Sequence, residues 1–258
     1  MKIYVCVKHV PDSAAKITIV GKNQIDESIT FLMNPYDEHA IEEAARLKMK
    51  LGDAEIIAVT LGKADAASTL QSALAMGADR GILITTDLVP DSMVTAGALK
   101  AAIDQDGRPD IIFTGKESID SEGFQTMFRL AAAMDMPAAS GVESFALAQG
   151  KVRVECDLEA GARSVIEMPL PCVIGCGKGL NKPSYPTLPA IIKARKKEVK
   201  QIDLQSLKIE APAGSIEILE LRPAVEARHP HEIRGSSEEI AAELMRILRE
   251  EAKVISEW

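Results

Sequence analysis

The feature that most constrains the fold is a regular alternation of short apolar runs with amphipathic segments along the first half of the chain. Apolar runs of strand length occupy residues 3–7, 55–61, 81–85 and 110–114. Continuous apolar strands are typical of parallel sheets that are covered by helices on both faces. The alternation therefore predicts an α/β fold with a doubly wound, mostly parallel sheet, the architecture of many nucleotide-binding domains.

Four helices are expected to follow these strands, over residues 37–51, 65–76, 93–103 and 123–134. The first of them has an apolar stripe at helical spacing. We expect its other side to face water, with the charged residues Glu38, Glu42, Glu43 and Lys50.

The pattern changes beyond Pro137. Residues 151–158 alternate charged and apolar side chains between the turn pairs Gln149-Gly150 and Ala160-Gly161, which is typical of a half-exposed antiparallel strand. Residues 165–168 and 171–176 are expected to complete this added hairpin region.

From about Ile202 the sequence is irregular until Ser236, which has capping-box spacing to Glu239 and opens an amphipathic helix. We therefore expect an α/β domain over residues 1–200 and a C-terminal arm over residues 201–258. The residues alone leave open whether the arm folds back on its own domain or docks on a partner.

Composition excludes several classes of function. The net charge of −8 and the sequence pI of 5.2 disfavour nucleic-acid binding, which uses a broad basic face. No apolar run reaches the roughly 20 residues that a membrane span needs, and the N-terminus lacks a signal-peptide pattern, so we expect a cytoplasmic protein without direct membrane insertion.

Metal and catalytic sites are not expected either. The four cysteines, Cys6, Cys156, Cys172 and Cys176, form no C-x-x-C pair, and the four histidines are scattered. No nucleophile or acid/base arrangement stands out, which favours a binding protein over an enzyme.

Two polar stretches precede predicted helices and are candidate phosphate sites. One is LMNPYDEHAIEEA, with Asn34 and Asp37, and the other is TGKESIDSEGFQT, with Ser121, Gly123, Gln125 and Thr126. Free N–H groups at a helix N-terminus bind phosphate or pyrophosphate, but the same polar residues are more often simple helix caps. Neither stretch is a P-loop or a G-x-G-x-x-G fingerprint.

A third stretch, NKPSYPTLPAIIKARKK, holds one leucine between prolines in front of a basic run. The prolines would hold Leu188 exposed on a rigid loop in front of these positive charges. The alternative is that Leu188 packs into its own domain and that the lysines form a solvated face.

The motifs together resemble the β subunit of electron transfer flavoproteins. The resemblance rests on MKIYVCVKHVPDS, LMNPYDEHAIEEAARLK, SALAMGADRGILI, GKESIDSEGFQT and LNKPSYPTLPAIIKARKK, which occur in that order over residues 1 to about 200. It implies a heterodimer with an α subunit that holds most of the redox FAD. It also implies an adenine nucleotide in this chain, either AMP or, in electron-bifurcating members, a second FAD.

The resemblance also implies which residues line the nucleotide pocket: Cys6, Asn34, Pro35, Tyr36, Asp37, Leu61, Gly115, Lys116, Ile119, Asp120, Ser121, Gly123, Phe124, Gln125 and Thr126. This chain departs from the family pattern at Phe124, where many members have a small or amide residue. A polar side-chain contact cannot form there, although backbone N–H groups and Thr126 remain available to a phosphate.

For the proline-rich stretch, the resemblance implies a recognition loop over residues 176–198 that docks on acyl-CoA dehydrogenases or related flavoenzymes. Leu188 is then the anchor, and the expected partner contacts are Tyr185, Leu188, Pro189, Ile191, Lys193 and Lys196. The rival hypothesis, from a different class, is a stand-alone adenine-nucleotide sensor or hydrolase on the same α/β layer.

Overall fold

The chain folds around one nine-stranded, mostly parallel sheet. The structure is a computed structural model that describes residues 1–209, 216–224 and 230–255. The central strands are β1 (Lys2–Cys6), β6 (Glu55–Gly62), β7 (Arg80–Thr85) and β8 (Ile111–Gly115), which confirms all four predicted parallel strands. The strand order is β11-β10-β9-β12-β8-β1-β6-β7-β13.

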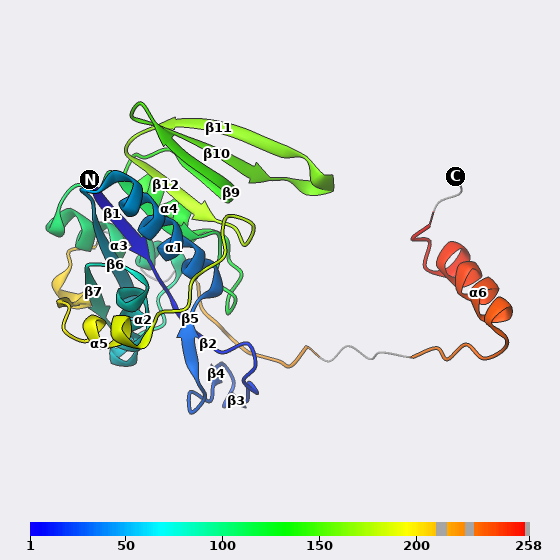
Figure 1. Cartoon of the computed structure of the whole chain (residues 1–258). Helices are drawn as coiled ribbons and strands as arrows, with labels where there is room; N and C mark the ends of the chain where they lie inside the picture. The colour runs from blue at the N-terminus through cyan, green and yellow to red at the C-terminus, as the bar shows by residue number, and fades with distance from the viewer. Residues whose placement is uncertain (210–215, 225–229, 256–258) are drawn as a thin grey trace. The chain divides into compact units, whose positions relative to one another are not determined.

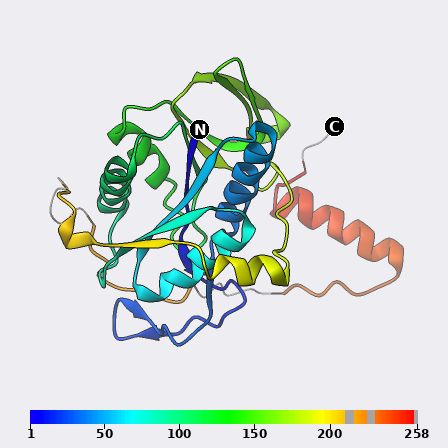
Figure 2. The same cartoon turned by 60° about the vertical axis from the view of Figure 1, so that its left-hand side comes forward.

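The predicted helices follow these strands along the chain and pack on both faces of the sheet (Figures 1 and 2). They are α1 (Pro35–Leu51), α2 (Ala67–Met76), α3 (Ser92–Asp106) and α4 (Thr126–Ala133), with a 3-10 turn η1 (Ala64–Ala66) before α2. One core joins α1 and α2 to one face of the sheet, and a second core joins α3 and α4 to the opposite face. The fold is thus doubly wound, as predicted.

Two short antiparallel pairs follow β1. They are β2 (His9–Pro11) with β5 (Phe31–Met33), and β3 (Ile19–Val20) with β4 (Gln24–Ile25). Both pairs precede α1, so they belong to the segment that leads from the central strand into the first helix.

The hairpin region is larger than expected and is joined to the main sheet. Beyond the predicted strand β10 (Lys151–Asp157) and its partner β11 (Arg163–Pro169), an eleven-residue strand β9 (Ala138–Ala148) was missed. A 3-10 turn η2 (Glu159–Gly161) links β10 to β11. The placement of β12 (Cys172–Cys176) in the hairpin region was wrong, because this fully buried strand pairs in parallel with β8.

The irregular segment does not begin at Ile202. Residues Val199–Asp203 form β13, which pairs in parallel with β7 and is followed by a 3-10 turn η3 (Leu204–Ser206). Ile202, Leu204 and Leu207 are buried in the core beside α3, so this edge strand is part of the domain. The first compact unit is Met1–Leu219 and therefore extends beyond residue 200, where we expected the domain to end.

The second unit is Glu220–Trp258, and its main element is α6 (Ser237–Arg246). The predicted capping box is confirmed: the Ser236 hydroxyl accepts from the Glu239 N–H, and the Glu239 carboxylate accepts from the Ser236 N–H at 2.8 Å. A π-helical turn, η4 (Ile247–Glu251), continues it. Within the described part of this unit no residue of α6 is buried.

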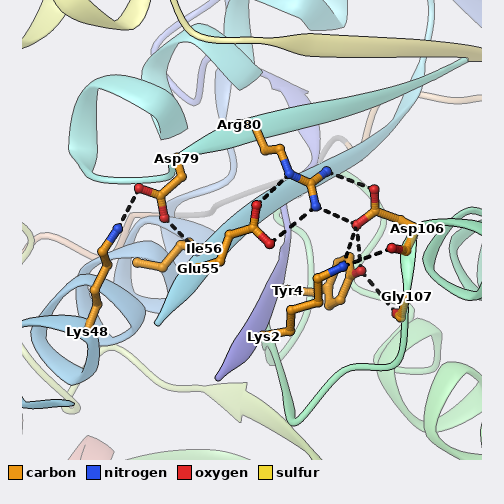
Figure 3. A network of polar contacts seen from close by, with 9 residues as sticks. All are labelled: Lys2, Tyr4, Lys48, Glu55, Ile56, Asp79, Arg80, Asp106 and Gly107. Atoms are coloured by element: carbon orange, nitrogen blue, oxygen red, sulfur yellow. Dashed lines mark hydrogen bonds and ion pairs between the residues drawn. The ribbon is translucent and has the colours of Figure 1, made fainter. Parts of the chain in front are cut away.

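A charged network fixes the amino ends of the central strands (Figure 3). Arg80 at the start of β7 makes two hydrogen bonds to the Asp106 carboxylate, at 2.8 and 2.6 Å, and a third to Glu55 at 2.7 Å. The Tyr4 hydroxyl donates to Asp106 at 2.7 Å. These bonds connect β1, β6, β7 and the end of α3 at the amino-terminal edge of the sheet, which leaves the opposite edge available for a site.

Candidate functional site

The predicted pocket residues gather at the carboxyl ends of the central strands. The sheet order places β6 and β7 on one side of β1 and β8 on the other, so the winding direction reverses between β1 and β8. Ligands of open α/β sheets bind at such a switch point. Cys6 ends β1, Gly115 ends β8, and Leu61 lies one residue before the end of β6.

The switch point is closed by two side chains at the start of α1. The Asp37 carboxylate accepts hydrogen bonds from the N–H of Lys8 at 2.7 Å and of Gly115 at 2.9 Å. The Asn34 amide donates to the Glu117 carbonyl at 2.8 Å and accepts from the Ile119 N–H at 3.2 Å. Both side chains are buried, so Asp37 joins the loop after β1 to the end of β8, and Asn34 holds the loop after β8, rather than facing an open pocket.

Close packing explains why β8 ends in glycine. A Cβ on Gly115 would lie 2.6 Å from the Cβ of Tyr36 and closer still to the Asp37 carboxylate. The start of α1, with Pro35 in its first turn, therefore rests directly on the backbone at the end of β8.

Burial changes the acidity of this centre. Desolvation raises the pKa of Asp37 to about 7, although the N–H donors of Lys8 and Gly115 oppose the rise. Burial, and next the charge of Asp37, raises the pKa of the Cys6 thiol to about 12. A thiol that stays protonated is a poor nucleophile, so Cys6 is suited to packing. No group of three or more His, Cys, Asp or Glu that would suit a metal ion occurs among the described residues.

The second helix N-terminus, that of α4, is open. The helix begins at Thr126 and not at Gly123 as expected, because Glu122 and Phe124 adopt positive φ angles of 45° and 52°. Neither Asp120 nor Ser121 caps it: Gln125 is the N-cap residue, and its side chain makes no capping hydrogen bond. The first turn contains no acidic residue, in contrast to α1 with Asp37 and Glu38.

The loop from β8 to α4 is bonded to the side chain of Lys8, a residue after β1 that we did not predict for the site. The ammonium group of Lys8 lies 2.7 Å from both carboxylate oxygens of Asp120 and 3.2 Å from the Ser118 hydroxyl. Ser118 in turn bonds to Ser121 at 2.9 Å. The available signal was the position of Lys8, two residues after a buried strand.

Lysines also flank Tyr36. The ammonium groups of Lys116 and Lys178 lie 5.2 and 5.1 Å from the centre of its ring, and Lys116 lies 6.0 Å from the ring of Phe124. Lys178 follows β12 and was outside the predicted set. Phe124 is 41% exposed and its ring centre lies 6.0 Å from that of Phe128, so an aromatic pair occupies the position of the expected polar contact.

The predicted recognition residues lie elsewhere, on the short helix α5 (Leu188–Ala194) and directly before and after it, and α5 packs against α2. Thr187 is its N-cap, and Pro189 lies in its first turn. Leu188 is 70% exposed and Tyr185 is 96% exposed, so neither packs into its own domain. Ile191 and Ile192 extend the exposed apolar row by one turn.

One lysine of the basic run is not available to a partner. The Lys197 ammonium donates to the carbonyls of Leu74 at 2.9 Å and Ala78 at 2.6 Å, at the end of α2. Burial lowers its pKa. The solvated part of the run is therefore Lys193, Arg195 and Lys196, all of them exposed.

The fold and this site define a class: a doubly wound α/β protein with an uncapped helix N-terminus at the switch point of its sheet. The family model of the electron transfer flavoprotein domain matches residues 23–207. Electron transfer flavoprotein subunit beta of Bacillus subtilis is 36% identical over 99% of this chain and 100% of its own length. The mitochondrial subunit beta of Arabidopsis thaliana is also 36% identical, over 99% and 100%, and the human subunit beta is 34% identical over 78% and 81%.

The chain therefore belongs to the family of electron transfer flavoprotein β subunits. This result confirms the resemblance drawn from the motifs. In the described part of the chain, no helix combines the length and the apolar character that a membrane crossing requires.

Proposed function

We propose that this protein is the β subunit of a heterodimeric electron transfer flavoprotein. It carries electrons from flavoenzymes of the acyl-CoA dehydrogenase type to a downstream acceptor and catalyses no reaction of its own. The geometric observation that carries the proposal is the row of exposed apolar side chains on α5, beginning with the 70% exposed Leu188. A short-lived electron-transfer complex requires a small contact of this kind, since the carrier must dissociate after each transfer.

The proposed nucleotide site is the open N-terminus of α4. The first N–H groups of a helix have no partner within the helix, and its dipole favours a phosphate there. Thr126 adds a hydroxyl at the first helical position. One guanidinium nitrogen of Arg129, a turn further along α4, is buried without a hydrogen-bond partner, which supports an anionic ligand near this turn.

We assign different roles to the two helix N-termini at the switch point. At the start of α1 the buried Asp37 carboxylate is already bonded to the N–H groups of Lys8 and Gly115. At α4 neither a capping side chain nor an acidic residue competes with a ligand. Phosphate contacts are therefore assigned to Ser121, Gly123, Gln125 and Thr126, whereas Asn34 and Asp37 shape the pocket.

The ligand that we propose for this site is AMP, with a second FAD as the alternative in an electron-bifurcating protein. The GKESID motif resembles the AMP type of the family, and Lys116 in it keeps its cationic side chain beside Tyr36. The redox FAD, bound mainly by the α subunit, supplies the electron-carrying chemistry at the interface.

Docking on a dehydrogenase is assigned to Tyr185, Leu188, Pro189 and Ile191, with Lys193 and Lys196 beside them. Exposed lysines act mainly on the rate of encounter with an acidic surface, whereas burial of Leu188 supplies affinity. The arm from residue 220 is assigned to the α subunit, because Leu244 and Met245 on α6 are 45% and 39% exposed. We also propose a cytoplasmic location.

Co-expression with an α subunit tests the function. We expect a yellow heterodimer whose flavin is reduced by an acyl-CoA dehydrogenase in the presence of acyl-CoA. One FAD per heterodimer together with bound AMP supports the AMP form, and two FAD support bifurcation. A colourless, stable monomer that hydrolyses adenine nucleotides would establish the rival function and refute the carrier.

A further inference from the structure

The polar side of α1 is covered, although its sequence predicts a solvated face. Glu42 is only 8% exposed and Glu43 only 6% exposed, so the expectation that both face water was wrong. Buried carboxylates need partners, because an unpaired charge away from water is costly. Besides Arg46 on α1 itself, the partners come from residues 181–184, which lie shortly before α5.

Glu42 bonds to the backbone of this segment. One carboxylate oxygen accepts from the Ser184 N–H at 3.1 Å, and the other accepts from the Nε of Arg46 at 2.7 Å. Arg46 also donates to the Lys182 carbonyl at 3.3 Å. Glu42 and Arg46 therefore satisfy one backbone donor and one backbone acceptor in residues 181–184, which have no regular secondary structure.

Asn181 completes the contact with α1. Its amide nitrogen donates to the Glu43 carboxylate at 3.0 Å and to the His39 carbonyl at 3.2 Å. Its amide oxygen lies 3.1 Å from Nδ1 of His39, and since an amide oxygen only accepts, His39 is the donor. We name Glu42, Glu43, Arg46 and Asn181 the α1 clamp.

The opposite end of α5 is also fixed. Ala194, its last residue, is buried, and Lys197 bonds to two carbonyls at the end of α2. The exposed row of Leu188, Ile191 and Ile192 thus lies between two anchored points. Between Ser184 and Leu188 the chain is short and contains Pro186, so a shift at the clamp is transmitted to the start of α5.

We propose that the α1 clamp is a positioning device that holds α5 in its docking conformation before the dehydrogenase arrives. The inference rests on the proposed function, since it assumes that α5 is the docking element. A preformed helix loses less conformational entropy on binding than a mobile segment, so affinity for the partner depends on residues that the partner never touches. Glu42, Glu43 and Asn181 are positioning residues in this sense.

The test uses the FAD-loaded heterodimer with Asn181→Ala and, separately, Glu42→Gln. The control is Glu198→Gln, which makes the same charge change close to α5 at an exposed residue. We expect the KM for the heterodimer in flavin reduction by an acyl-CoA dehydrogenase to rise about five- to tenfold, the net effect of one typical hydrogen bond, with kcat within about twofold. The control should match the unmodified protein.

Hydrogen exchange separates this inference from the function on which it rests. Amides of residues 184–194 should exchange faster in both clamp variants while the sheet stays protected, whatever dehydrogenase is used. Adding Asn181→Ala to Leu188→Ala should raise KM little further, because both changes act through the same contact. Unchanged exchange over residues 184–194, or an equal rise in KM for Glu198→Gln, would overturn the clamp. If Glu42→Gln does not fold, Asn181→Ala, which removes no charge, decides alone.

Discussion

Replacing Leu188 gives the most direct test of the proposed docking on an acyl-CoA dehydrogenase. Leu188 is 70% exposed, so a partner pocket can bury most of its side chain. Full burial of a leucine contributes about 1.5–3 kcal/mol, and alanine keeps the first carbon of the side chain. Leu188→Ala should therefore lose about 1–1.5 kcal/mol of docking free energy, which is about a five- to twelvefold weaker complex.

The assay is steady-state reduction of the heterodimer flavin by an acyl-CoA dehydrogenase, with the heterodimer as the varied substrate. KM should rise by that factor, whereas kcat, flavin content and nucleotide content should stay unchanged. The midpoint of thermal unfolding should also stay unchanged, because most of the atoms that the substitution removes are exposed to solvent in the free protein.

Leu88 offers a matched control, since it is 71% exposed in the loop after β7. Leu88→Ala should leave KM unchanged in heterodimer that has assembled normally. A loss of 2–5 kcal/mol in the free energy of unfolding of Leu188→Ala, with dehydrogenase turnover intact, would identify Leu188 as a core residue and refute the recognition helix.

Four further perturbations separate stability from binding. Asp37→Asn should lower the free energy of unfolding by about 1–3 kcal/mol, since one of two backbone N–H groups then faces an amide N–H₂. Because burial raises the pKa of Asp37 to about 7, the carboxyl loses stabilising effect as the pH rises from about 4 to 7; the deficit of the variant in urea unfolding should be larger at pH 5 than at pH 8. Burial alone would raise the pKa of Asp106, but hydrogen bonds from Arg80 and Tyr4 outweigh it and lower the pKa to about 2. Its contribution of about 2 kcal/mol should be nearly complete by pH 5 and disappear as the pH falls below 2, so Asp106→Asn should destabilise about half as much at pH 3 as at pH 7. Deleting residues 220–258 should abolish heterodimer formation in co-purification while the first unit keeps its circular dichroism spectrum; retained heterodimer would contradict the role of the arm. Lys193→Gln with Lys196→Gln should slow association in stopped-flow mixing and flatten its dependence on salt, and an unchanged salt slope would exclude these lysines from steering.

The sequence was sufficient for β1, β6, β7 and β8, because these buried strands read as continuous apolar runs. It did not show that β12, which has the same pattern, pairs with β8 and not within the hairpin region. It failed where a strand lacks that signature. Ala138–Ala148 contains alanine, serine and glycine, and Val199–Asp203 lies at a sheet edge, with a half-exposed pattern. Pairing with β12 and β7, respectively, decides the conformation of these two segments, and such tertiary contacts leave no local pattern.

For the candidate pocket, too, the sequence predicted some features and missed others. Position along the chain identified Asn34 and Asp37, because they precede a predicted helix, but it does not tell which way a side chain points. The structure turns both inward, and it also directs Lys197 to the carbonyls of α2 rather than to solvent. The start of α4 was misjudged because two non-glycine residues with positive φ interrupt an otherwise helical sequence.

The inward direction of Asp37 has a consequence for how variants of this protein should be interpreted. Polar residues lie at the start of both α1 and α4, yet at α1 the Asp37 carboxylate satisfies the N–H groups of Lys8 and Gly115, whereas at α4 the first turn has neither a capping side chain nor an acid. We therefore expect a substitution at Asp37 to act first on folding, and to change nucleotide content only as a result. In the proposed nucleotide site, a substitution at Thr126 should act on the ligand alone, because that half-exposed side chain closes no part of the fold. Nucleotide content measured beside unfolding free energy distinguishes the two kinds of residue, although both lie at one switch point.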